Sequence, residues 1–242
     1  MSLNKRIVNI VLVLSLVAAI GAVGISSGAR NPSQENSRAA VQAAFREGGL
    51  KSAAAASGGH YAATTQWISE IAHTLDSMVE GSEVVLVGEL VENFAHLSAS
   101  GEYITTDYRM RVQRSLKGWV LPQSDVVFQV MGGKVVFEDG SSAVIETRGF
   151  VRPSIGARVV IFANPFPVDD PLMPPAVRAY ANGAPVFRLV GMGRGVIELP
   201  SNENDRIRMN AVGARDPGAR KMRGMSVAHF LVELARVVRE SR

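Results

Sequence analysis

Apolar and polar residues alternate most regularly over residues 103–116, and this period of two predicts a β-strand. Such a strand packs one face in a core and turns the other toward water. The apolar face consists of Ile104, Tyr108, Met110, Val112 and Leu116. The opposite face consists of Tyr103, Thr105, Asp107, Arg109, Arg111 and Gln113.

Shorter strand-like runs lie on both sides of this segment. The pair Asp139-Gly140 between two of them is typical of a tight hairpin turn. Seven or eight short strands at close spacing favour an antiparallel barrel or sandwich. The further strands are predicted at residues 83–92, 126–131, 135–137, 143–147, 158–163, 185–190 and 195–199. The predicted core includes Val85, Val87, Tyr108, Met110, Val112, Val160 and Phe162.

Two segments show the helical spacing of apolar residues instead. Residues 65–80 predict an amphipathic helix before the first strand, and Gly81 ends it. Residues 226–242 predict a second helix, with Ser226 as its N-cap. We therefore expect a mainly β domain with an amphipathic helix on each flank.

The first 29 residues have the pattern of an export signal or a membrane anchor. Lys5 and Arg6 precede an apolar run over residues 7–25, and Ser27 and Ala29 suit the −3 and −1 positions of a signal peptidase site. The apolar run is also near the minimum length that spans a bilayer. Cleavage and retention as an anchor both remain open, and retention is the only membrane contact we expect.

Residues 30–63 are rich in alanine, glycine and serine, as in Gly48-Gly49 and Gly58-Gly59. So few large apolar side chains offset little of the entropy that ordering costs, which predicts a flexible tether. The expected organisation is thus a signal or anchor (1–29), a tether (30–63) and a β-barrel domain with N- and C-terminal helices (64–242).

The charge is unevenly distributed along the chain. The whole sequence has a formal net charge of +4, but residues 30–147 hold 9 basic and 14 acidic side chains, whereas residues 148–242 hold 15 and 8. The chain has no cysteine, which excludes a thiol nucleophile, a thiolate metal site and a lipidated cysteine. An exported chain without disulfides is typical of the bacterial envelope.

The sequence contains no recognisable catalytic or metal-binding motif. The four histidines, His60, His73, His96 and His229, are scattered, and neither HExxH nor G-x-S-x-G occurs. We therefore predict no catalytic residue, no metal and no cofactor. The acidic residues in and near the first two strands, Glu89, Glu92, Glu102 and Asp107, are expected to lie on exposed strand faces.

A basic segment near the C-terminus is the one candidate binding site. Arginine forks suit phosphate and carboxylate groups, so the segment predicts contact with an anionic partner. No aromatic residue lies among the basic ones, so nucleic acid is not expected. A merely solvated loop is the alternative interpretation. The candidate residues are Arg206, Arg208, Arg215, Arg220, Lys221 and Arg223.

The run from Ser82 to Pro165 resembles a class of uncharacterised bacterial exported proteins. The similar segments are residues 83–90, 103–118, 126–133 and 153–162. The resemblance implies an antiparallel OB-type β-barrel, similar to the inhibitory domain of tissue metalloprotease inhibitors and to netrin-like modules. Those inhibitors act through an N-terminal cysteine that this chain lacks, so the implied fold does not bring the inhibitory mechanism with it.

Together these observations predict a non-catalytic exported interaction module of the bacterial cell envelope. It would reside in the periplasm or on the outer face of the cytoplasmic membrane. Its partner would be an envelope protein, an anionic lipid or an anionic glycan. The alternatives are an envelope enzyme with an unfamiliar site and a membrane-anchored structural protein.

Overall fold

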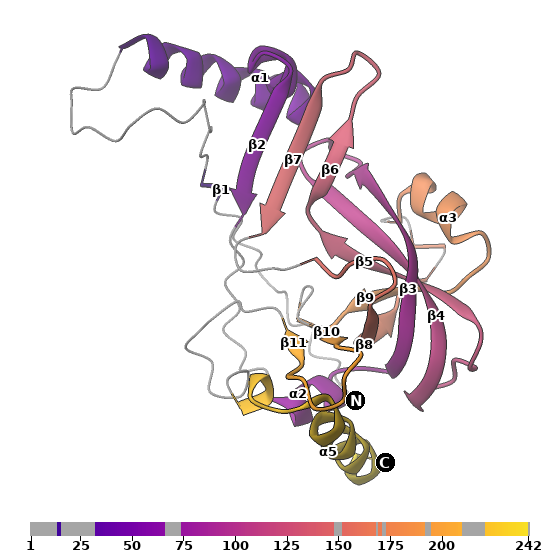
Figure 1. The fold of residues 1–242 in the computed structure, drawn as a ribbon. Helices are drawn as coiled ribbons and strands as arrows, with labels where there is room; N and C mark the ends of the chain where they lie inside the picture. The colour runs from indigo at the N-terminus through magenta and orange to yellow at the C-terminus, as the bar shows by residue number, and fades with distance from the viewer. Residues whose placement is uncertain are drawn as a thin grey trace, which may run out of the picture.

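The computed structural model describes residues 14–15, 32–65, 74–147, 152–167, 169–170, 173–191, 195–209 and 221–241. Within these ranges the fold is mainly β, as predicted, with helices packed around two sheets (Figure 1). The smaller sheet contains β1 (Leu14–Ser15), β2 (His60–Thr65), β6 (Gly133–Val136) and β7 (Ser142–Thr147). The larger contains β3 (Val84–Leu97), β4 (Ile104–Lys117), β5 (Asp125–Met131), β8 (Arg158–Pro165), β9 (Val186–Leu189), β10 (Val196–Leu199) and β11 (Arg208–Met209).

The larger sheet has the order β11-β10-β8-β3-β4-β5-β9, and β9 also pairs with β8. Strands β3, β4, β5, β9 and β8 therefore pair one after another in a cycle. The prediction of purely antiparallel pairing is wrong for two pairs, because β5 runs parallel to β9 and β2 runs parallel to β7. Long connections separate the strands of both pairs along the chain, which is what parallel pairing requires.

The predicted core residues are all buried, which confirms the strand patterns that carry them. They lie on two sides of the larger sheet. Tyr108, Met110 and Val112 belong to the apolar cluster shared by β3, β4, β5, β8 and β9. Val85, Val87, Val160 and Phe162 face α2 (Leu75–Glu80) and α5 (Val227–Glu240) instead.

Both predicted helices are present in part or in full. Helix α5 begins at its predicted N-cap, where the Ser226 Oγ accepts a hydrogen bond from the His229 N–H at 3.3 Å. Its apolar face packs on the sheet through Phe230 and Leu234. Of the helix predicted over residues 65–80, the structure has α2 with Thr74 as its N-cap; Thr65 belongs to β2, and residues 66–73 lie outside the described residues.

In place of the flexible tether predicted over residues 30–63, the structure has helix α1 (Pro32–Ala56), which breaks at Gly48 and Gly49, followed by strand β2. Leu50 of α1 and Tyr61 of β2 are buried in one apolar cluster between the helix and the smaller sheet. Small residues let the helix approach the sheet closely, and β2 pairs with β7 over its whole length. Gly49 has φ +65°, and a Cβ there would lie 2.5 Å from the Gly101 carbonyl oxygen. The pairing of β2 with β7 joins segments far apart in the chain, so the composition of residues 30–63 alone does not reveal it.

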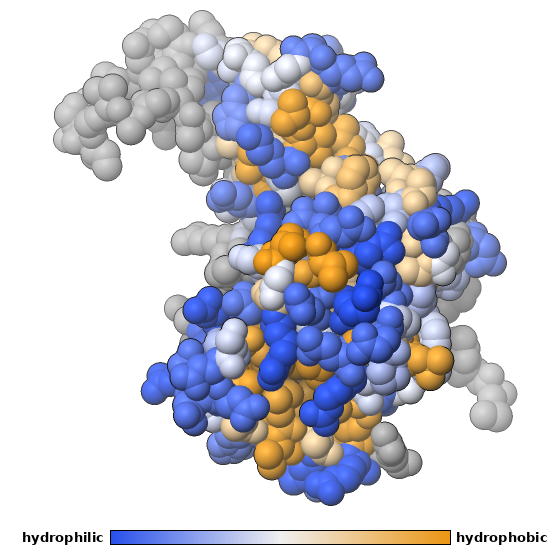
Figure 2. Space-filling model, turned by 45° about the vertical axis from the view of Figure 1, so that its right-hand side comes forward, coloured by the Kyte–Doolittle hydropathy of each residue, from blue (hydrophilic) through white to orange (hydrophobic). Residues whose placement is uncertain are grey.

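A hairpin and a short helix flank the two sheets. The hairpin predicted at Asp139-Gly140 joins β6 and β7, and Gly140 adopts the left-handed conformation with φ +81°. Helix α3 (Pro175–Ala181) covers the outer side of β5, with Val127, Phe166 and Val177 buried between them. The view in Figure 2 shows apolar surface as patches among hydrophilic side chains.

No helix among the described residues is long and apolar enough to cross a bilayer. Apart from Leu14–Ser15, the segment predicted to be a signal or anchor lies outside the described residues. Export therefore stays a prediction from the sequence.

Candidate functional site: an arginine-lined pocket

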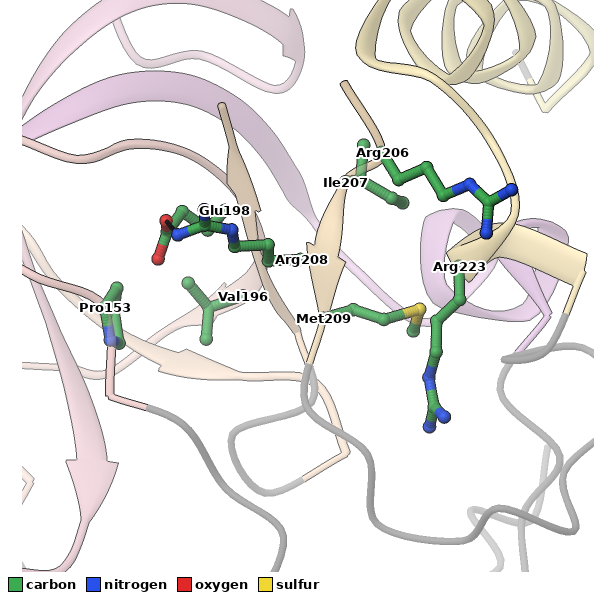
Figure 3. A pocket seen from close by; sticks show the side chains of 8 residues that line it. All are labelled: Pro153, Val196, Glu198, Arg206, Ile207, Arg208, Met209 and Arg223. Atoms are coloured by element: carbon green, nitrogen blue, oxygen red, sulfur yellow. Dashed lines mark hydrogen bonds and ion pairs between the residues drawn. The ribbon is translucent and has the colours of Figure 1, made fainter. Parts of the chain in front are cut away.

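A pocket of about 430 Å³ opens beside strands β10 and β11. Apolar side chains and several charged ones share its wall, so it combines a hydrophobic surface with the means to bind charge. Figure 3 shows the side chains that line it: Pro153, Val196, Glu198, Arg206, Ile207, Arg208, Met209 and Arg223.

The alternation of residues 206–209 places the arginines at the pocket. Ile207 is buried in the cluster under α2 and α5, and its N–H donates to the Met225 carbonyl at 3.1 Å. Because side chains of a strand alternate, Arg206 and Arg208 then point away from that cluster and are exposed. Arg208 lies directly opposite Glu198 on β10, and the two form an ion pair at 3.1 Å.

Arg223 has a different environment. Its neighbours Met222 and Met225 are buried in the core cluster and hold this segment against the body of the protein. The Nε and Nη2 atoms of Arg223 are buried, and no acceptor for them is present among the described residues. Buried guanidinium nitrogens without an acceptor are costly, so this group is suited to a carboxylate or phosphate oxygen.

The three guanidinium groups do not converge on one point (Figure 3). Arg208 lies against Glu198, whereas Arg206 and Arg223 extend from the other side of β11 in different directions. The arrangement therefore does not chelate a single small anion. It suits an extended partner that carries several negative charges.

The structure brings three of the six predicted binding residues together at this pocket, namely Arg206, Arg208 and Arg223. Lys221 is exposed nearby in sequence but does not line the pocket. Arg215 and Arg220 lie outside the described residues.

A second polar cluster, which the sequence interpretation missed, lies between β3 and β4. The His96 Nε2 and Asp107 Oδ2 atoms are 2.9 Å apart, and the side chains are 7% and 0% exposed. Gln129 donates from Nε2 to the Asp107 Oδ1 at 2.9 Å. The prediction that Asp107 lies on an exposed face is therefore wrong. The pairing register slips between Leu90 and Glu92, and beyond this bulge His96 comes onto the same face as Asp107.

Both ring nitrogens of His96 face an acceptor. Nδ1 lies 3.0 Å from the Leu97 carbonyl oxygen, and Nε2 faces the Asp107 carboxylate. Burial lowers the pKa of His96, but the Asp107 side chain and the Leu97 carbonyl together raise it above its usual value of 6.5. The protonated imidazolium is the form that satisfies both contacts. Neither nitrogen is left to exchange a proton with a substrate, so the pair is a structural element rather than a general base.

Arg109 holds the end of helix α3 beside the His96–Asp107 cluster. The guanidinium donates to the Tyr180 and Ala181 carbonyls at the end of α3, forms an ion pair with Glu92, and lies 5.0 Å from the centre of the Tyr180 ring. Burial and the nearby Glu92 raise the pKa of Tyr180 to about 12. Phe94 stacks between Tyr180 and His96. These contacts explain how a charged pair on the outer side of the sheet is kept from water.

The raised pKa of His96 predicts a pH-dependent contribution to stability. A group that holds its proton more tightly when folded stabilises the fold fully below its unfolded pKa of 6.5, and the stabilisation is lost as the pH rises through the higher folded value. The free-energy difference between wild type and His96→Gln, measured by urea unfolding from pH 5 to pH 9, should therefore shrink with rising pH. The exposed His229→Gln serves as the control. A difference that does not change with pH would contradict the assignment.

Among the described residues, no group of three or more histidine, aspartate or glutamate side chains is placed to hold a metal ion. No protein-family model matches the sequence, and no curated protein matches it significantly.

Proposed function

We propose that the protein is an exported, non-catalytic binding module of the bacterial cell envelope whose arginine-lined pocket binds an anionic partner. The observation that carries the proposal is the half-buried Arg223, whose Nε and Nη2 atoms are buried beside the pocket without an acceptor among the described residues. Arg206 adds a second positive charge, whereas Glu198 offsets that of Arg208. The pocket is thus positive overall and has an apolar wall.

We also propose that the cycle of β3, β4, β5, β8 and β9 is an OB-type barrel. Two features support this: each strand of the cycle pairs with two other strands of the cycle, and all of these pairs are antiparallel except the parallel pair β5 and β9. Barrels of this type serve mainly as binding scaffolds. The Lys5 and Arg6 signal and the apolar run behind it support export.

Extended polyanions are suitable probes, because the arginines of the pocket point in different directions and can contact separate negative charges. Polygalacturonate presents carboxylates and polyphosphate presents phosphates, so the two distinguish the chemistry of the partner. Binding of the full chain to the preferred probe should weaken steeply between 0.01 M and 0.15 M salt, since the Debye length falls from about 30 Å to about 8 Å. Replacing Arg206 and Arg223 by glutamine should weaken binding at low salt by about tenfold or more, because each loses a charge-assisted hydrogen bond.

A matched control is available on other parts of the surface. Arg114→Gln with Lys134→Gln removes the same charge from exposed positions: β4 is separated from β10 by two strands, and β6 belongs to the smaller sheet. This variant should bind within about twofold of wild type. If the pocket variant and the control variant bind equally well to both polymers, the pocket is not the binding site.

A further inference from the structure

The turn between β4 and β5 exposes two large apolar side chains. Trp119 is 60% exposed and Leu121 is 72% exposed, while Val120 between them is 4% exposed and belongs to the core cluster inside the cycle of strands. Trp119 also rests against Phe187, with ring centroids 6.0 Å apart. Such a pair of neighbouring exposed residues differs from the isolated apolar residues common on protein surfaces.

The exposure is fixed by the backbone of the turn. Gly118 has φ +93°, and a Cβ there would lie 2.7 Å from the Val84 Cγ1, so the chain turns where only glycine fits. At the other end the Gln123 N–H donates to the Val112 carbonyl at 2.7 Å. Val120 anchors the middle of the turn. The two apolar side chains are thus held outward by a rigid loop and cannot fold back into the core.

The charges around the turn limit what it can contact. Residues 118–124 contain no ionisable side chain, so the turn can leave water without desolvating a charge. Arg114 precedes it on β4 and is exposed, whereas the Lys117 Nζ donates to the Val79 carbonyl at 2.7 Å. Of the acidic residues beside it, Asp125 is paired with Arg111, and Glu83 lies next to Gly118. A neutral apolar tip with the exposed Arg114 behind it matches the layers of a bilayer surface, where tryptophan is enriched.

We propose that this turn inserts Trp119 and Leu121 past the headgroups into the outermost acyl region of a lipid bilayer. The proposal rests on the envelope location given above but is independent of the arginine pocket. Two side chains present far less area than the roughly 800 Å² per partner of a stable protein interface, which disfavours a second copy or another protein. A bilayer requires no such area, because it surrounds each inserted side chain on all sides.

Brominated lipids test the contact directly, since bromine quenches only a tryptophan that touches the acyl region. The full chain is reconstituted in phosphatidylcholine–phosphatidylglycerol vesicles with and without brominated chains. The protein has two tryptophans, Trp67 and Trp119, so the Trp119→Phe variant gives the background from Trp67. We expect bromine-dependent quenching in the wild type well above this background.

Leu121 provides the second arm of the test. Leu121→Ser should lower the equilibrium constant for binding to the vesicles by about tenfold, because the transfer of a leucine side chain from water contributes at least that factor. The variant should therefore also show less quenching of Trp119. Val232→Ser removes a side chain that is 71% exposed on α5 and should leave the quenching unchanged.

Two results overturn the proposal directly: wild-type quenching no greater than the background, and quenching in Leu121→Ser equal to that of the wild type. A blue-shifted Trp119 emission without quenching also overturns it, because that indicates contact with protein. Pocket variants that lose polyanion binding but keep this quenching would separate the two proposals.

Discussion

Replacing Asp107 by alanine is expected to lower the free energy of unfolding by about 3–5 kcal/mol. The carboxylate is 0% exposed, faces His96 at 2.9 Å and accepts a hydrogen bond from Gln129 at 2.9 Å. Its removal leaves a buried imidazole and a buried amide without their acceptor. The imidazolium must then lose its proton, and both groups must admit water or remain unsatisfied, each of which costs free energy.

Urea unfolding at pH 6 measures this effect while His96 is protonated. Asp125→Ala is the matched control, because Asp125 also pairs with a cation, Arg111, but at a partly exposed site. It should cost about 1 kcal/mol or less. Asp107→Asn keeps the volume and isolates the charge, and it should cost less than Asp107→Ala. If Asp107→Ala and Asp125→Ala prove equally mild, the His96–Asp107 pair does not stabilise the buried cluster.

The alternation of residue types was sufficient to predict most strands of the fold. The run over residues 103–116 forms β4, and the apolar run over residues 158–163 forms β8. Burial of one face of a strand produces alternating apolar residues and burial of both faces produces a continuous apolar run, and both patterns are visible in the local sequence. Strand order and the parallel pairs were not predictable. They depend on which distant segments meet, as when β2 joins β7.

Segments rich in small side chains were predicted least well, as in the tether expected over residues 30–63. Alanine and glycine give little periodic signal, yet close packing needs small residues, and Leu50 of α1 packs in one apolar cluster with Tyr61 of β2. The bulge that places His96 beside Asp107 has no signature in the sequence either. Without the register between β3 and β4, nothing in the sequence indicates that His96 and Asp107 lie side by side.

The arginine site was predictable only as a cluster of charge. Composition identified the basic segment, but the pocket depends on the pairing of Arg208 with Glu198 across β10 and β11. It also depends on Arg223, whose burial follows from the anchoring of Met222 and Met225 in the core. The pocket wall and the core under α5 are therefore one packed unit.

Phe162 lies in the centre of that unit. It is fully buried in the cluster that contains Ile207, Met222 and Met225, the residues that hold the pocket arginines in place. Its backbone also pairs with the segment before β10, where its N–H donates to the Gly195 carbonyl at 2.8 Å. A defect at this position should consequently reach both the stability of the fold and the shape of the site.

Phe162→Ala is expected to lower the free energy of unfolding by about 3–5 kcal/mol, because truncating a buried phenylalanine removes apolar burial and leaves a cavity. Domains of this size are stable by only about 5–15 kcal/mol, so the variant should melt at a markedly lower temperature. Trp119→Ala is the control: it truncates an aromatic side chain that is 60% exposed and should cost about 1 kcal/mol or less.

Binding to the preferred polyanion, measured below the melting temperature, should also weaken in Phe162→Ala but not in Trp119→Ala, because only the former loosens the support of Arg206 and Arg223. Equal melting temperatures for Phe162→Ala and wild type would show that β8 does not pack against α5 as described. Normal polyanion binding by a destabilised Phe162→Ala would show instead that the pocket is held independently of this core.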